Sequence, residues 1–219
     1  MLKSSCRMLR RNCLMLSRLA LACLALGAQL ALAGSADLQR FLPQDCHHHG
    51  QFTQQKHLPA LAQPLTSEGR FAFSCKAGLI WHSDNPLRET LVYPLKAKPW
   101  GLDAEGQRQG LDGPVHKQLG NLLNRLIGGD LTYLERHFHI TGGETERLTL
   151  VPKAARMKRF VQSIQVVPNE QQVEILMTHS AEESTHIHIL AQQSLPQLSA
   201  EACTQALPDL ATACQGLLP

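Results

Sequence analysis

Apolar and polar residues alternate along several short segments in the first half of the chain. The clearest case is residues 70–76, where Phe71 and Phe73 point one way and the residues between them point the other way. A period of two residues is typical of a β-strand with one buried face. Residues 78–82 and 89–95 read as the next strands, and a polar Asn-Pro sequence between them predicts a turn.

The middle of the chain changes to the period of a helix. Residues 115–127 carry leucines at helical spacing, namely Leu119, Leu122, Leu123 and Leu126. Gly128 and Gly129 predict the end of this helix, and Asp130 is suited to cap a second, short one. The polar residues 96–114, rich in Gly and Pro, predict a loop.

Strand-like segments return in the second half. Residues 147–151, 160–167, 172–177 and 185–191 are separated by polar turns, and residues 198–210 predict a C-terminal helix. Because the strands come in consecutive runs, the helices cannot be the crossovers of a parallel sheet. The pattern predicts an α+β fold: an open, unclosed antiparallel barrel or strongly curved sheet, with helices covering its concave face as a lid.

Such a sheet encloses an apolar cavity when its helices lift slightly. The side chains expected in the cavity and lid are Phe71, Phe73, Leu79, Trp81, Leu119, Leu122, Leu123, Leu126, Ile164, Ile175 and Ile187. For Trp81 and the leucines of residues 119–126 the alternative is ordinary core packing, and both descriptions hold if the core contains a ligand.

The N-terminal 33 residues predict an export signal. A basic segment ending at Arg18 precedes an uncharged apolar stretch, and Ala31-Leu32-Ala33 is a small-residue cleavage pattern. Cleavage after Ala33 would leave one domain, residues 34–219, in the periplasm. The net charge of +3 then falls below zero, so the basic balance gives no indication of nucleic-acid binding. A lipid-anchoring site at Cys23 is the alternative.

Four cysteines remain after the signal, an even number that suits an oxidising compartment. They allow three pairings. We favour Cys46 with Cys75, joining the N-terminal segment to an early strand, and Cys203 with Cys214, closing a C-terminal helix or loop. The alternative is that one pair stays reduced.

The chain lacks the common catalytic motifs. It has no GxSxG, HExxH, P-loop or GxGxxG sequence, and Ser67 has no histidine nearby in the sequence. We therefore expect a binding protein, without a cofactor, rather than an enzyme; a periplasmic hydrolase is the alternative. The sequence Ser67-Glu68-Gly69 is interpreted as a turn in which the glycine adopts a positive φ.

Histidines offer a second alternative. His47, His48 and His49 are adjacent, and His186 and His188 would share one face of a strand, as in some metal sites. No carboxylate or cysteine stands at ligand spacing beside either group in the sequence. We therefore predict no metal site, a polar loop for the first group and a solvent-facing strand side for the second.

Several segments together resemble a known family. Phe52-x-Gln54-x-Lys56, Ser67-x-Gly69-x-Phe71 and Gly78-Leu79-x-Trp81 are followed by Leu148-x-Leu150-x-Pro152-Lys153 and Phe160-x-x-Ser163-Ile164. In order and spacing these look like the periplasmic outer-membrane lipoprotein carrier family, LolA. The resemblance covers roughly residues 38–193.

The resemblance implies an open antiparallel barrel lidded by helices and a monomeric carrier that shields acyl chains on the way to the outer membrane. Its implied partners are an acylated cargo, an inner-membrane transporter and an outer-membrane acceptor. Two departures stand out: Ile80 replaces an arginine that holds the lid, and Glu146-Arg147 replace a tryptophan. These favour a divergent branch tied to export of glycolipids or polyene lipids. A non-carrier accessory subunit of such an exporter is the alternative.

Overall fold

The computed structural model describes residues 40–43, 45–103, 105–142, 147–169 and 172–218. The expected signal peptide therefore lies outside the described residues. The elements in chain order are β1 (His47–His57), β2 (Leu65–Ser74), β3 (Gly78–Asn85), β4 (Glu89–Pro94), β5 (Trp100–Leu102), β6 (Arg108–Gly110), α2 (Pro114–Ile127), α3 (Leu131–His137), β7 (Phe138–Thr141), β8 (Leu148–Pro152), α4 (Ala155–Lys158), β9 (Ser163–Asn169), β10 (Gln172–Thr178), β11 (Ser184–Ser194), α5 (Ala200–Ala206), the 3-10 helix η1 (Pro208–Leu210) and α6 (Ala211–Leu217). None of the helices among these residues has the length and apolar character needed to cross a membrane.

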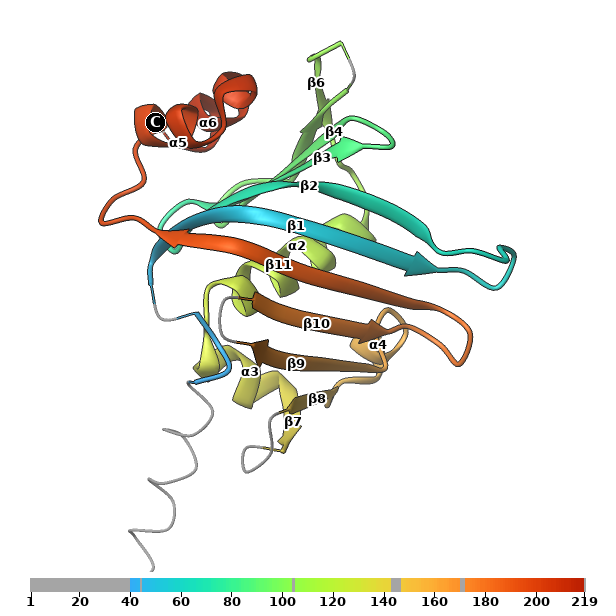
Figure 1. Ribbon diagram of the computed structural model, residues 1–219. Helices are drawn as coiled ribbons and strands as arrows, with labels where there is room; N and C mark the ends of the chain where they lie inside the picture. The colour runs from blue at the N-terminus through green and yellow to red at the C-terminus, as the bar shows by residue number, and fades with distance from the viewer. Residues whose placement is uncertain (1–39, 44, 104, 143–146, 170–171, 219) are drawn as a thin grey trace, which may run out of the picture. The chain divides into compact units, whose positions relative to one another are not determined.

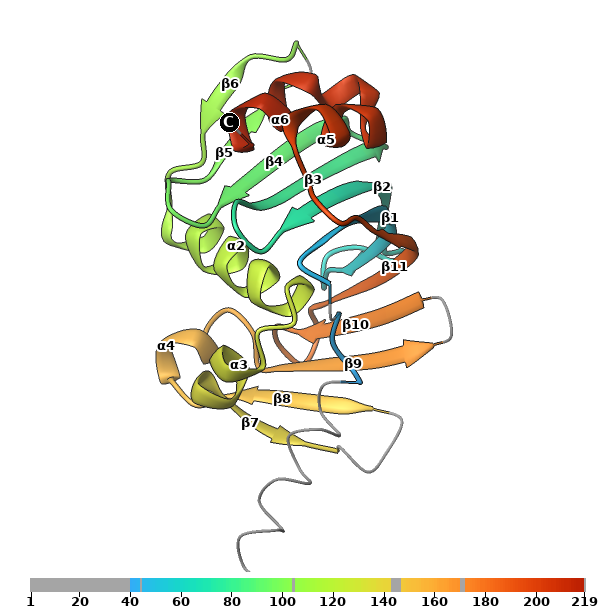
Figure 2. The ribbon, with the colours of Figure 1, turned by 90° about the vertical axis from the view of Figure 1, so that its left-hand side faces the viewer.

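The strands form one antiparallel sheet, which has 11 strands in the described part of the chain. Their order is β6-β5-β4-β3-β2-β1-β11-β10-β9-β8-β7, so β6 and β7 stand at opposite edges and the sheet does not close (Figure 2). The sheet curves around α2 (Figure 1). The predicted fold class, an unclosed and curved antiparallel sheet with helices, is confirmed.

Alternate residues of each strand point to two faces, both of which are covered. We call the face that carries Phe71 and Trp81 the inner face, because these residues pair across β2 and β3 and face α2. The outer face carries Ala72 and Ile80, which pack against the C-terminal helices. Figure 1 shows α2 on one side of β2–β4 and α5 and α6 on the other. The helix predicted for residues 115–127 therefore covers the concave face, and the C-terminal helices, for which the sequence predicted no position, cover the outer face.

A close-packed core lies between the outer face and the C-terminal helices. Its largest side chain, Trp100, is 3% exposed, and Gly216 packs directly against it: a Cβ at Gly216 would lie 2.8 Å from the indole ring. The core comprises Ala72, Ile80, Val92, Trp100, Leu102, Leu198, Cys203, Leu207, Leu210, Ala213, Cys214, Leu217 and Leu218. The disulfide Cys203–Cys214 closes the two helices on each other, as predicted.

The second predicted disulfide, Cys46–Cys75, is also present and joins the residue before β1 to the residue after β2.

Three local predictions are wrong. Residues 96–114 are not all loop, because β5 and β6 lie within them. The histidine run is not a polar loop but the start of β1, and His48 is fully buried with its ring 5.0 Å from that of Phe73.

The third wrong prediction concerns Gly69, which lies within β2 and not in a turn, and does not adopt a positive φ. A Cβ at this position would lie 1.9 Å from the carbonyl oxygen of His82 and 2.8 Å from the ring of Phe52. Glycine is therefore required for space: it lets the Phe52 ring cross β2 and stack on Trp81, with ring centroids 3.7 Å apart.

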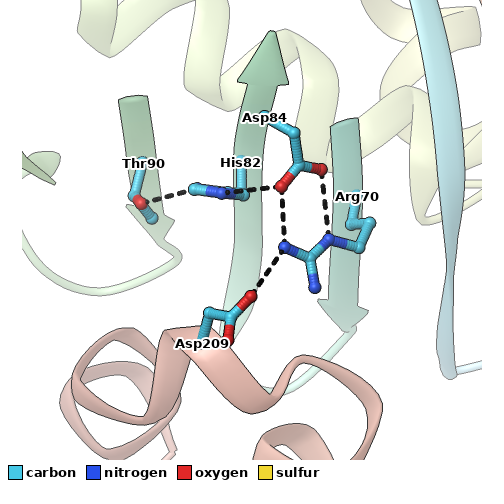
Figure 3. Close-up of polar contacts among 5 residues, drawn as sticks. All are labelled: Arg70, His82, Asp84, Thr90 and Asp209. Atoms are coloured by element: carbon cyan, nitrogen blue, oxygen red, sulfur yellow. Dashed lines mark hydrogen bonds and ion pairs between the residues drawn. The ribbon is translucent and has the colours of Figure 1, made fainter. Parts of the chain in front are cut away.

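A polar cluster fastens η1 to the outer face (Figure 3). Arg70 Nη2 and Nε donate to the two carboxylate oxygens of Asp84 at 2.7 and 3.1 Å, and Nη2 lies 3.4 Å from Asp209 of η1. His82 Nδ1 lies 2.8 Å from Thr90 Oγ1, while its Nε2 lies 3.2 Å from Asp84 without the alignment of a hydrogen bond. Burial lowers the pKa of His82, opposed by the charge of Asp84.

Candidate functional site

A hollow of about 540 Å³ lies between the inner face and residues 115–123 of α2. Its apolar lining is Trp81, Leu91, Tyr93, Val115, Leu119, Leu122, Leu123, Met157, Phe160, Val161, Met177 and Ile187. Its polar lining is Gln54, Lys56, Ser83, Glu89, Gln118, Arg159, His179, Ser180, Glu183 and Thr185. The volume lies in the range of ligand pockets, about 300–1,000 Å³.

The C-terminal half of α2 is packed tightly onto the sheet. The space between this end of the helix (Leu126 and Ile127) and the sheet residues that face it, such as Phe71 and Ile175, is only about 20 Å³. The helix ends at Gly128 and Gly129, where added side chains would lie 2.6 Å from the Phe73 ring and 2.1 Å from the carbonyl oxygen of Pro43. Gly129 has a φ of 63°, and its N–H donates to the Leu126 carbonyl, so the glycines both end the helix and allow its close approach.

Gly120 marks the middle of α2 and holds it against β4. A Cβ at Gly120 would lie 2.2 Å from the ring of Tyr93, and Asn124 Nδ2 donates to the Tyr93 carbonyl oxygen at 3.0 Å. Burial raises the pKa of the Tyr93 hydroxyl. That hydroxyl is buried and has no hydrogen-bond partner in the described part of the chain, although Tyr93 lines the hollow.

The N-terminal end of α2 is held more weakly. Its capping residue, Gly113, offers no side-chain hydrogen bond, and the first turn has no acidic residue to complement the helix dipole. Val115 in this turn is 53% exposed. A second hollow of about 610 Å³, lined by Lys117 and Asn121 among others, lies along the helix beside the first. The first half of α2 is therefore less well supported than its second half.

Trp81 lines the hollow and belongs to a stack of aromatic rings on the inner face. Trp81 is 5% exposed, stacks on Phe52 and lies 6.1 Å from Phe71 between ring centroids. This stack spans β1, β2 and β3, and the register of the strands places its members at neighbouring positions of the inner face. Trp81 is therefore closely packed from behind, whereas the N-terminal end of α2 has few contacts that hold it.

Charged and polar groups surround the mouth. Lys56 Nζ lies 3.7 Å from Glu183, with both side chains more than a third exposed. His179 Nδ1 lies 2.7 Å from the Phe160 carbonyl oxygen and must donate to it, because a carbonyl oxygen can only accept. In the neutral ring Nε2 then accepts from the Thr185 hydroxyl at 2.9 Å. With both nitrogens engaged, His179 is not free to act as a base toward the neighbouring Ser180.

The predicted cavity residues fall into three groups. Those that line the hollow are Trp81, Leu119, Leu122, Leu123 and Ile187. Those that line the small space under the C-terminal half of α2 are Phe71, Leu126 and Ile175. Those that fill the core are Phe73, Leu79 and Ile164, each at most 2% exposed. All are on the inner face or on α2, but only the first group lies where a ligand has room.

Sequence reasoning missed several lining residues. Leu91 and Tyr93 alternate in β4 and stand opposite Trp81 and Leu79 of β3, so the same period of two would have placed them on the inner face. Met177 continues the Ile175 face of β10. Phe160 and Val161 were expected in a strand, but they precede β9 and carried no signal for their position.

Ile80 requires a different interpretation from the one the resemblance implied. It is fully buried on the outer face, pairs with Ala72 and Val92, and packs in the core under the C-terminal helices. A side chain at this position cannot contact α2, so the residue at position 80 does not indicate how the helix is held.

No protein-family model and no curated protein matches this sequence. Similar solved structures include a LolA superfamily protein from Nitrosomonas europaea, with 10% identity, TM-score 0.44, and coverage of 76% of this chain and 94% of that one. A DUF1329 family protein from Desulfovibrio piger has 10% identity, TM-score 0.45, and coverage of 77% and 94%. A domain named as an outer membrane lipoprotein-sorting protein, from Vibrio parahaemolyticus, has 10% identity, TM-score 0.41, and coverage of 80% and 97%.

Proposed function

We propose that this protein binds the acyl chain of a lipid or lipidated molecule in the hollow under α2 and carries it through the periplasm. The observation that supports this most is the hollow itself. A space of about 540 Å³ stays open beside a core in which Leu79, Ile164 and Phe73 are at most 2% exposed. Protein interiors are otherwise close-packed, so a space of this size with one apolar side and a polar rim supports a ligand-binding role.

The energetics suit a carrier. Each methylene moved from water into an apolar site contributes about 0.8 kcal/mol, so a chain of ten methylenes would gain about 8 kcal/mol before the cost of ordering it. Trp81, Leu122 and Ile187 supply the apolar contacts. The polar rim would keep the head of an amphiphile in water while its tail is buried.

Release requires a wall that can move. The C-terminal half of α2 is fixed by Gly128 and Gly129, whereas its first turns have a weak cap and a hollow on each side. We infer that these first turns act as the lid, swinging about the anchored end to admit and release the acyl chain.

The hollow opens beside apolar loop tips. Lys56, Ser83 and Glu89 line it and stand at the ends of the β1–β2 and β3–β4 hairpins. These hairpins expose Leu65 and Leu87 to 53% and 78%, and Val115 at the start of α2 is also exposed. Apolar side chains around the mouth suit contact with a membrane-bound donor and acceptor of the cargo.

The compartment and partners follow from the same proposal. Two disulfides suit an oxidising compartment, and the predicted export signal would deliver the chain to the periplasm. With the sequence resemblance, this favours an acylated cargo passed from an inner-membrane transporter to an outer-membrane acceptor, and a monomer that acts by binding rather than catalysis.

A fluorescent fatty-acid analogue tests the proposal. The wild-type protein should bind it with an emission change, and Leu122→Asp or Trp81→Asp should abolish that change because a carboxylate would enter the apolar lining. Gln205→Asp is the control: the same charge at an exposed position of α5, on the outer face of the sheet, should leave binding within about twofold.

Failure of the folded wild-type protein to bind any acyl probe would overturn the carrier proposal. Absence of probe binding together with capture of a membrane protein would instead favour an accessory subunit of an exporter. Turnover of ester substrates would favour a hydrolase. Circular dichroism of each variant would separate loss of binding from loss of the fold.

A further inference from the structure

Three potential metal ligands meet on the outer face of β10 and β11. Glu174 of β10 stands directly opposite His188 of β11, and His186 lies two residues before His188 on the same face. One ligand atom of each residue lies within 4.8 Å of those of the other two, and all three side chains are half-buried. The sequence shows no carboxylate at ligand spacing beside the two histidines, but the pairing of β10 with β11 brings Glu174 next to them.

The contacts within the group are close. His186 Nε2 lies 2.5 Å from Glu174 Oε1, and the rings of His186 and His188 have centroids 4.4 Å apart. An ordinary ion pair would account for His186 and Glu174. It does not account for the second imidazole, which lies beside the first and has a ring nitrogen within 4.8 Å of the same carboxylate.

Two imidazoles and one carboxylate are a ligand set used for Zn²⁺, with metal–ligand distances of about 2.0–2.2 Å. In a tetrahedral site the ligand atoms would be about 3.4 Å apart. That separation lies between the 2.5 Å contact and the 4.8 Å limit seen here, so side-chain rotations suffice to reach it. The paired strands β10 and β11 hold the three side chains in fixed positions.

We propose that Glu174, His186 and His188 bind a divalent transition-metal ion, with Zn²⁺ the best fit and water in the fourth position. Thr53 and Gln55 of β1 stand opposite His188 and His186 in the register and are placed to support the ligands from outside. The site lies behind the cavity wall, since Thr185, Ile187 and Met177 of the same strands line the hollow. The inference is independent of the proposed function.

Calorimetric titration of the purified protein with ZnCl₂ at pH 7.5 tests the site. His186→Ala/His188→Ala and Glu174→Gln should each weaken Zn²⁺ binding by about tenfold or more. His57→Ala/His139→Ala is the matched control, because it removes two exposed histidines outside the group and should leave the affinity within about twofold.

A second measurement identifies the ligands. X-ray absorption of the zinc-loaded wild-type protein should show two imidazoles, and the His186→Ala/His188→Ala variant should lose that signature while unfolding at the same temperature as the wild type without zinc. Wild-type protein that binds no Zn²⁺, or variants at positions 174, 186 and 188 that bind as tightly as the wild type, would overturn the proposal. The latter result would assign the ion to other histidines, such as the run at the start of β1.

Discussion

Both faces of β2 and β3 carry buried apolar residues, but the two faces are packed to different degrees. On the outer face, Ala72 and Ile80 touch helices that a disulfide holds together, and Gly216 meets Trp100 without a gap. On the inner face, Phe71 and Trp81 face α2, which packs tightly onto the sheet at its C-terminal end and leaves a hollow nearer its N-terminal end.

The difference shows how a strand with apolar residues on both faces can pack against a different helix on each face. In Phe71-Ala72-Phe73 and Leu79-Ile80-Trp81 the outer-face residues Ala72 and Ile80 are smaller than the aromatic residues beside them, and both sets are buried. The smaller residues allow helices to approach the outer face closely, while the larger ones on the inner face support a helix over a hollow. The outer face is therefore the closely packed side of the sheet, and the inner face is the side that leaves a hollow.

The largest expected effect comes from placing a carboxylate on each face. Leu210→Asp should lower the free energy of unfolding by more than about 3 kcal/mol, because Leu210 is 2% exposed in a core without space for water. Leu122→Asp should cost less than half of that, since its carboxylate can be hydrated in the hollow. Urea unfolding of both variants measures the difference; equal losses would mean that the two faces are packed alike.

Removing the outer disulfide is expected to have the next largest effect. Cys203→Ser/Cys214→Ser should lower the free energy of unfolding by about 3 kcal/mol, because the bond closes a loop with a sequence separation of 11. Affinity for the acyl probe should stay within about twofold below the melting temperature. A parallel loss of probe binding would show that the two faces are coupled and would contradict the comparison.

Much of the fold could be predicted because it rests on local periodicity. The alternation around Phe71, the leucine spacing of α2 and the glycines after it gave the strands, the helix and its end. The short strands β5 and β6 could not be predicted, since three residues are too few to show a period and their pairing comes from β4. The position of α5 and α6 could not be predicted either, because the outer-face residues that they cover include small ones such as Ala72, which do not stand out as buried in the sequence.

The candidate site was predicted only in part, for a related reason. Alternation assigns a residue to a face, and it placed Trp81 and Ile187 correctly beside the hollow. It does not tell how closely a helix packs at each point along a strand, so Phe73 and Ile164 were expected in the cavity and lie in the core. Glu174 meets His186 through the strand register, which no local pattern encodes.

Each face also buries a histidine, and each histidine should make the free energy of unfolding fall at acidic pH. Burial lowers the pKa of His48 on the inner face to about 4, whereas the unfolded chain keeps a value near 6.5. Between these values the unfolded state binds a proton that the folded state does not, so stability is full above pH 6.5 and falls as the pH drops toward 4. The expected loss from pH 7.5 to pH 5 is about 2 kcal/mol.

His48→Gln should remove that part of the pH dependence, as measured by urea unfolding at the two pH values. His82→Gln on the outer face should remove a smaller part, because the nearby Asp84 opposes the burial that lowers the pKa of His82. A larger change in pH dependence for His82→Gln than for His48→Gln would contradict this prediction, because it would mean that burial on the outer face disfavours histidine protonation more strongly than burial on the inner face.

The smallest expected effect concerns the ion pair that links η1 to the sheet. Asp209 is 57% exposed and lies 3.4 Å from Arg70, whose guanidinium is already paired with Asp84 at 2.7 Å. Asp209→Asn should therefore lower the free energy of unfolding by about 0.5 kcal/mol, a loss that high salt reduces. Unfolding at low and high salt measures it. A loss above about 2 kcal/mol would mean that charge, rather than the packing around Trp100, holds the outer helices in place.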